Sequence, residues 1–249
     1  MVWVVASMAA LFALGGRGAV ELATDVRSAP SEPPAPARAA ASWPALAAIR
    51  LAPFPPPPPP GAATGRSAAP LGPSRAVGRP EDGRLVNGRL FPAGSANHFT
   101  WDNVRRQVPN RAWRRYGTER LIQVVQRVLH EFALAHPTAA RVGVGDLSRP
   151  RGGPFGTQFG GLGHATHQNG LDADVYYPRR DRREVEARRP AQVDRALAQD
   201  LVNRFVRAGA QVIYVGPSLK LRGPSRVVVP LVHHDDHLHV RIRKPRPPR

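Results

Sequence analysis

The sequence predicts an α+β fold with a mainly antiparallel β-sheet and flanking helices. Two segments carry apolar residues at three- and four-residue spacing, as amphipathic helices do. Between and after them lie short segments in which apolar and polar residues alternate, the pattern of half-buried strands. Helices and strands interleave without a regular repeat, which favours the α+β class over α/β.

Composition divides the 249-residue chain into four parts. Residues 1–25 contain an apolar run of signal-peptide length and predict an export signal or, alternatively, an apolar N-terminal segment. Residues 26–81 are rich in Pro and Ala and predict a linker without a core. Large apolar side chains return in residues 82–243, which predict one folded domain, and residues 244–249 form a basic tail. We expect an exported protein without a transmembrane span in its mature form.

The first half of the folded domain contains one predicted helix and two predicted strands. Residues 118–136 have one apolar face, which includes Leu134, and Pro137 ends the pattern. Residues 141–147 predict a short strand. The glycine-rich residues 149–163 follow as a loop, which we interpret as either the rim of a cleft or a surface loop.

The second half repeats this mixture. Alternation predicts a strand over residues 171–177, and residues 190–208 predict a helix with Pro190 in its first turn and Gly209 as its terminator. Further strands are predicted at residues 211–215 and 237–242. A β-branched run, Val227-Val-Val229, lies between them.

Charge and cysteine content limit the possible functions. The 36 Lys+Arg residues against 18 Asp+Glu give a formal net charge of +18 and predict attraction to polyanions, including anionic cell-wall polymers. The arginines lack the aromatic interleaving of a nucleic-acid platform, which disfavours nucleic acid as the partner. The chain has no cysteine, so a metal site must use His, Asp or Glu.

Six of the nine histidines lie in two segments, 163–177 and 233–242. Alternation places Asp172 and Asp174 on one face of the first strand, and His237 and His239 on one face of the second. If the strands share a sheet, His167, one aspartate and His239 can close on one ion and leave a fourth position for water, as in a catalytic zinc site. These residues alone do not decide between the two aspartates. Taken singly, each of them is better explained as a solvated or hydrogen-bonded residue; it is the clustering of histidines and aspartates on two alternating segments that favours a metal site.

Both segments resemble motifs of a known family. Residues 164–174, His-Ala-Thr-His-Gln-Asn-Gly-Leu-Asp-Ala-Asp, resemble the first zinc-ligand motif of the penicillin-insensitive murein endopeptidases, and residues 234–241 resemble the second. The family is part of the lysostaphin, D-alanyl-D-alanine-peptidase and hedgehog-like zinc group. Residues 145–154 resemble the approach to the site, and the similarity covers about residues 83–243. His164 also matches a family position.

This resemblance implies a hedgehog/D-alanyl-D-alanine-peptidase-like fold and a zinc site. Carried over position by position, it implies that His167, Asp174 and His239 bind Zn2+. It also implies that His237 is the active-site base and that His234 is an auxiliary group near the developing oxyanion.

The implied activity is hydrolysis of D-alanyl-diamino-acid cross-links in peptidoglycan, in the periplasm or the cell envelope. Arg149 or Arg151, on the loop before the site, is a candidate for binding a substrate carboxylate, with surface solvation as the alternative. Two other functions remain open on the same zinc site, D,D-carboxypeptidase and L,D-endopeptidase. A non-catalytic basic protein that binds cell wall or nucleic acid is the alternative from a different class.

Overall fold

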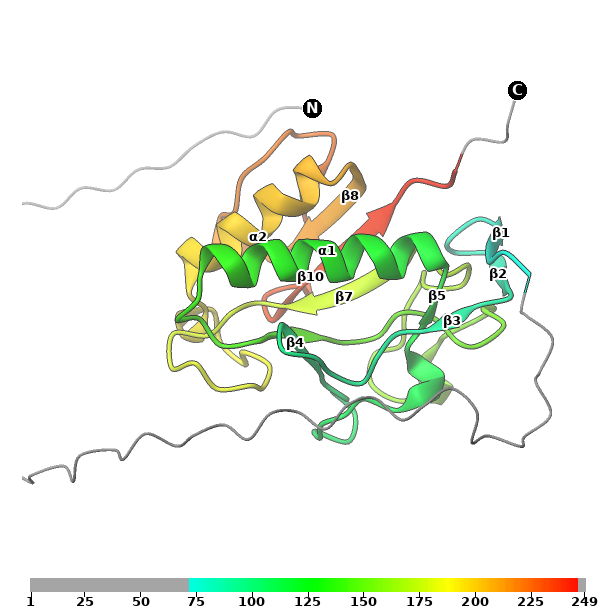
Figure 1. Cartoon of the computed structure of the whole chain (residues 1–249), viewed down its shortest axis with the longest axis horizontal. Helices are drawn as coiled ribbons and strands as arrows, with labels where there is room; N and C mark the ends of the chain where they lie inside the picture. Colours follow the sequence, from blue (N-terminus) through cyan, green and yellow to red (C-terminus); the bar gives the residue numbers. More distant parts are fainter. Residues whose placement is uncertain (1–71, 246–249) are drawn as a thin grey trace, which may run out of the picture. The chain divides into compact units, whose positions relative to one another are not determined.

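Figure 1 shows a computed structural model of the chain, which describes residues 72–245. The described part has two α-helices, one six-stranded sheet and two small two-stranded sheets, so the α+β class is confirmed. The helices are α1 (Glu119–Ala135) and α2 (Arg195–Arg207). The strands are β1 (Arg75–Gly78), β2 (Gly83–Val86), β3 (Arg89–Leu90), β4 (His98–Thr100), β5 (Tyr116–Gly117), β6 (Val142–Val144), β7 (Asp172–Tyr176), β8 (Ala210–Val215), β9 (Val228–Pro230) and β10 (His237–Ile242).

The main sheet is mixed. Its order is β4-β6-β7-β10-β8-β9, and its inner pairs β6-β7, β7-β10 and β10-β8 are antiparallel, as predicted. The edge strands β4 and β9 instead pair in parallel with their neighbours. The connection from β4 to β6 contains α1, which is long enough to cross over the sheet. Pro230 lies in the edge strand β9, where its missing N–H disrupts the ladder least.

Helix α1 has nearly the predicted bounds because its N-cap is strong. The Thr118 hydroxyl accepts a hydrogen bond from the Leu121 N–H at 3.2 Å. Six side chains of α1 are buried: Leu121, Ile122, Val125, Val128, Leu129 and Phe132. Leu134, predicted to belong to this face, is instead 69% exposed, so its prediction was wrong.

Helix α2 begins later than its apolar pattern predicted. Residues Pro190–Gln192 form a separate 3-10 turn, and Val193 is extended. The α-helix starts at Arg195 because the Asp194 carboxylate accepts hydrogen bonds from the next two free N–H groups, those of Ala196 and Leu197. Gly209, with φ of 80°, follows the helix as predicted.

The main sheet separates the core from a polar face. Both helices lie on one face of the sheet, where they cover β7 and β10 (Figure 1). Side chains such as Val175, Leu238 and Val240 are fully buried in the same core cluster as the apolar residues of α1 and α2. Alternation sends the intervening polar side chains to the opposite face. There the register places His239 opposite Asp174 on β7 and opposite Tyr214 on β8.

The described residues cover only some of the chain segments predicted from the sequence. The predicted N-terminal segment, most of the predicted linker and most of the basic tail lie outside the described residues. Strand β1 precedes residue 82, the predicted start of the domain, and the β1-β2 turn spans that position. Within residues 72–245, no helix has the length and apolar character needed to span a membrane.

Candidate active site

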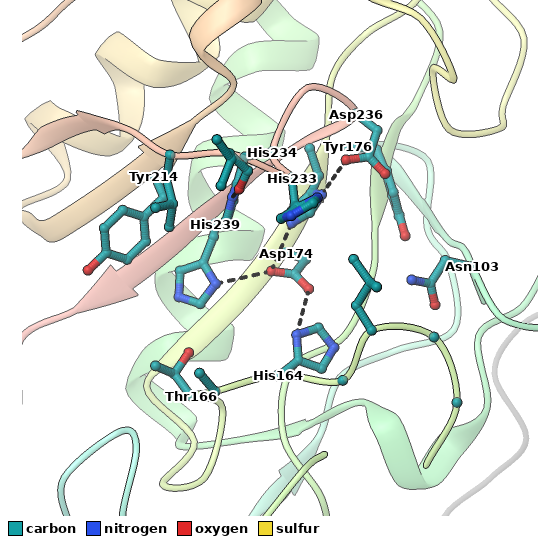
Figure 2. Close-up of a pocket in the computed structure, with 18 of the residues that line it drawn as sticks. Asn103, His164, Thr166, Asp174, Tyr176, Tyr214, His233, His234, Asp236 and His239 are labelled. Carbon is teal, nitrogen blue, oxygen red and sulfur yellow. Dashed lines mark hydrogen bonds and ion pairs between the residues drawn. The ribbon is translucent and has the colours of Figure 1, made fainter. Parts of the chain in front are cut away.

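A cavity of about 530 Å3 opens on the polar face of the sheet, and both histidine segments line it (Figure 2). Asp174 on β7 and His239 on β10 form its floor. The loop before β10 contributes His233 and His234, and the end of the glycine-rich loop, residues 160–163, contributes the facing wall. Residues distant in the sequence therefore meet because β7 and β10 are neighbours in the sheet.

Three side chains converge on one oxygen of Asp174. Its Oδ1 atom lies 3.3 Å from His167 Nε2 and 3.3 Å from His239 Nδ1. These two imidazole nitrogens are 3.1 Å apart. His237 Nε2 lies slightly farther from the same oxygen, at 3.6 Å. The structure thus brings together His167, Asp174 and His239, with His237 beside them.

His167 is held by the backbone. Its side chain is fully buried, and its residue has a positive φ of 67°. The His167 Nδ1–H donates to the Leu147 carbonyl oxygen, and because a carbonyl can only accept, Nε2 is left with its lone pair facing Asp174. Gly170, also at positive φ (77°), follows in the turn that connects His167 to β7.

His237 is oriented by its neighbour in the sequence. Asp236 Oδ1 lies 2.7 Å from His237 Nδ1, which turns Nε2 toward Asp174. The adjacent Asp235 has another role, because its carboxylate accepts hydrogen bonds from the backbone N–H and the hydroxyl of Ser218. Asp236 therefore orients the ring, and Asp235 anchors the loop.

His234 lies next to His237 and is half-buried. Its ring centroid is 4.9 Å from that of His237 and 5.9 Å from that of Tyr214. Its Nδ1–H donates to the Val232 carbonyl oxygen at 2.8 Å. Neutral His234 therefore has a lone pair on Nε2 and donates from that atom only when it gains a second proton.

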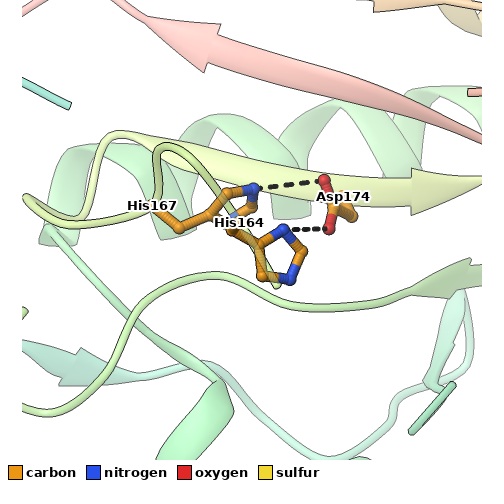
Figure 3. Close-up of side chains that lie close together, drawn as sticks. All are labelled: His164, His167 and Asp174. Atoms are coloured by element: carbon orange, nitrogen blue, oxygen red, sulfur yellow. Dashed lines mark ion pairs between the residues drawn. The ribbon is translucent and has the colours of Figure 1, made fainter. Parts of the chain in front are cut away.

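His164 lies next to His167 and faces the second oxygen of Asp174 (Figure 3). Its Nδ1 atom lies 3.7 Å from Asp174 Oδ2, and its Nε2 atom lies 2.8 Å from Asp146 Oδ2. Asp146 is buried and forms a two-point ion pair with the buried guanidinium of Arg114, with contacts of 2.7 and 2.5 Å. A charged pair inside the protein thus fixes the ring of His164.

Burial and the close charges shift the pKa values in opposite directions. Burial alone would raise the pKa of Asp174, but the neighbouring imidazoles of His167 and His237 hold it well below its ordinary value. Burial lowers the pKa of His167 and His234. Against burial, contacts with Asp172 and Asp174 raise the pKa of His239 to about 9. Asp174 is therefore ionised near neutral pH, while burial favours the neutral form of His167 and His234.

The donor set fits a metal ion. Asp174 Oδ1 is buried and has no hydrogen-bond partner among the described residues, although three imidazole nitrogens face it. Ligand atoms about 2.0–2.1 Å from a tetrahedral zinc ion are roughly 3.3 Å apart, close to the separations within the set of His167, Asp174 and His239. A second set, formed by His164, His167 and Asp174, has its ligand atoms within 4.8 Å of one another.

The structure also shows residues that the sequence did not single out. Asn103, Arg114 and Tyr214 line the cavity. Arg149, predicted to bind substrate, is not among the lining residues, since its guanidinium lies over the Phe159 ring at 4.3 Å and donates to a backbone carbonyl. No local pattern marks these three lining residues, which come from a turn, the 3-10 helix Ala112–Arg114 and strand β8.

Fold and site together define a class: an α+β protein with a candidate metal centre of imidazoles and one carboxylate in an open cavity. Residues 76–215 match the family described as penicillin-insensitive murein endopeptidase, and the chain belongs to this family. His234, His237 and His239 lie beyond the residues matched by this family, and the geometry of the cavity joins them to the first motif.

Relatives of known name agree with this assignment. The chain is 29% identical over 205 residues to the penicillin-insensitive murein endopeptidase of Salmonella heidelberg (strain SL476), covering 70% of this chain and 68% of the relative. It is 30% identical over 206 residues to the protein of the same name from Salmonella arizonae (strain ATCC BAA-731 / CDC346-86 / RSK2980), with the same coverage. The resemblance inferred from the two motifs is thereby confirmed.

Proposed function

We propose that this protein is a zinc-dependent peptidoglycan hydrolase that cleaves D-alanyl-diamino-acid cross-links. One observation carries the proposal: a buried carboxylate oxygen without a hydrogen-bond partner, faced by imidazole nitrogens in an open cavity. Family membership supports the substrate class. Such a substrate locates the enzyme in the periplasm or the cell envelope.

His167, Asp174 and His239 would hold the ion. His239 is preferred over His164 as the third ligand because its Nδ1 faces the same Asp174 oxygen that His167 faces. His164 instead faces the other oxygen and is held by Asp146. When bound, zinc supplies Lewis acidity, which polarises the scissile carbonyl and makes water more acidic.

His237 is the general base in this proposal. It takes a proton from water as the water oxygen bonds to the carbonyl carbon, and it returns that proton to the amine as the C–N bond breaks. Asp236 keeps the Nε2 atom of His237 directed at the cavity throughout. His234 lies beside the developing oxyanion and donates to it only as an imidazolium, a form that its lowered pKa makes scarcer.

A second hollow beside the cavity supports an endopeptidase over a carboxypeptidase. Beyond the loop before β10, the cavity continues into a second hollow of about 440 Å3, and the two share Asn103, Leu162, His233 and Asp236. Glu186 and Arg188 line the second hollow. A cleft with groups of both charges suits a branched peptide whose diamino acid ends in an amine and a carboxylate.

The test is digestion of purified cross-linked muropeptides, read by mass spectrometry, together with the zinc content of the protein. We expect one zinc per chain, cleavage at the D-alanyl cross-link, loss of cleavage on chelation, and loss in His239→Ala. His136→Ala removes a histidine outside the cavity and is the matched control. Protein without stoichiometric zinc, or full cleavage by His239→Ala, contradicts the proposal. Retention on DNA at physiological salt without cleavage favours the non-catalytic alternative.

A further inference from the structure

Asp172, the aspartate that the sequence left as a rival to Asp174, lies behind the proposed ligands. It is fully buried on β7, where its register partner on β10 is Arg241. Its Oδ1 atom lies 2.8 Å from His239 Nε2 and 2.7 Å from Arg241 Nε. We propose that Asp172 is a positioning residue that fixes His239 for zinc binding, an inference that rests on the zinc site proposed above.

The contact between Asp172 and His239 Nε2 decides which nitrogen of His239 has a free lone pair facing the cavity. An ionised carboxylate only accepts hydrogen bonds, so the proton of neutral His239 belongs on Nε2. The lone pair then remains on Nδ1, the atom that lies 3.1 Å from His167 Nε2 and 3.3 Å from Asp174 Oδ1. A ring with the opposite tautomer would direct an N–H at the ion position and exclude coordination.

Arg241 adds to this role. Its Nε–H contacts the same oxygen that accepts from His239, so a fixed positive charge holds the carboxylate in place and favours its ionised form. His167 receives the equivalent support from the Leu147 backbone carbonyl, which no side-chain substitution removes. The support of His239 comes from a side chain, that of Asp172, so a point substitution can remove it and test its role.

The chain contains a matched arrangement outside the cavity. Asp200 Oδ2 lies 2.8 Å from His136 Nε2 and 2.6 Å from Arg204 Nε, nearly the geometry around Asp172. Asp200→Asn thus removes a carboxylate charge from the same combination of an aspartate, a histidine and an arginine. The control is more exposed than Asp172, so folding stability is measured for both variants by urea unfolding.

The experiment compares the zinc affinity of the full chain with those of Asp172→Asn and Asp200→Asn by competition with a chromophoric chelator. We expect Asp172→Asn to bind zinc about 10–100-fold more weakly and Asp200→Asn to bind as the unchanged chain does. 15N NMR of the zinc-loaded chain is expected to show the His239 proton on Nε2, a signature that a merely structural role would not require.

Equal zinc affinity of Asp172→Asn and the unchanged chain overturns this inference while leaving the proposed function intact. The same holds for an NMR signature with the proton of zinc-loaded His239 on Nδ1. Failure of the unchanged chain to bind zinc overturns both proposals together. Weak binding by Asp172→Asn that Asp200→Asn shares equally also contradicts the positioning role, because the loss then follows from general destabilisation.

Discussion

The buried ion pair between Arg114 and Asp146 gives the most demanding prediction for stability. The two side chains are 1% and 3% exposed, and they share two contacts. Replacing one member leaves the other charge buried without its partner, which costs about 3–5 kcal/mol. We therefore expect Asp146→Asn to lower the free energy of unfolding by about this amount at pH 7.

The pKa of Asp146 gives an independent estimate of the electrostatic part. Despite burial, contacts with His164 and Arg114 lower this pKa from 3.8 to about 2. The shift corresponds to about 2 kcal/mol of stability. Because the folded-state pKa is the lower one, this stability is fully present above about pH 4 and is lost as the pH falls through 2. Asp146→Asn should lose this part of the pH dependence, while the part that comes from other carboxylates with a lowered pKa, such as Asp172 and Asp174, remains.

Urea unfolding at pH 7 and at decreasing pH measures both quantities. Glu184→Gln is the matched control. Glu184 forms a two-point ion pair with Arg141 on the surface, where the two side chains are 35% and 41% exposed. That change should cost no more than about 1 kcal/mol. A loss below 1 kcal/mol for Asp146→Asn, or equal losses for the two variants, would refute the reasoning.

Three further predictions concern the site and the turn beside it. Asp172 and Asp174 raise the pKa of His239 to about 9 against the effect of burial, so a proton competes with the metal for this ring below that pH. The apparent zinc affinity, measured by chelator competition, should therefore rise up to tenfold per pH unit toward pH 9. A zinc affinity that does not change with pH would contradict this. Gly170→Ala should lower the melting temperature, because it combines a φ of 77° with a new Cβ 2.7 Å from Leu85 Cδ1. Gly209→Ala is the control: its φ is 80° but no atom lies within 4 Å of the new Cβ, so it measures the conformational cost of about 1–2 kcal/mol by itself. Equal losses of stability in the two variants would show that the contact with Leu85 is harmless. Muropeptide cleavage should continue undiminished in the presence of a β-lactam, because the proposed reaction forms no serine acyl-enzyme, and time-dependent inhibition would argue against it.

The sequence predicts the parts of the fold that depend on local periodicity. The period-two alternation of residues 237–242 predicts β10 with the observed bounds. The same pattern predicts which residues of β7 and β10 share a face, and hence that His239 and Asp174 can meet. Their role as metal ligands stays a prediction, as do those of His237 and His234.

What the sequence does not predict depends on contacts between distant residues. The choice between Asp172 and Asp174 is one example: both alternate onto the same face, and only the positions of His167 and Arg241 separate them. Tyr214 enters the cavity because β8 pairs with β10, which no local pattern specifies. The later start of α2 reflects competition between an apolar pattern and the Asp194 cap, and the cap prevails.

Strand β10 directs alternate residues to the cavity and to the core. His237 and His239 face the cavity, while Leu238 and Val240 are fully buried on the other side. Inserting or deleting one residue here would exchange the two faces at once, presenting leucine to the cavity and imidazole to the core. Insertions are therefore expected to be tolerated better in the loops around the cleft than in this central strand. Because the strand has neighbours on both sides, its amides should exchange with deuterium only when the whole domain unfolds.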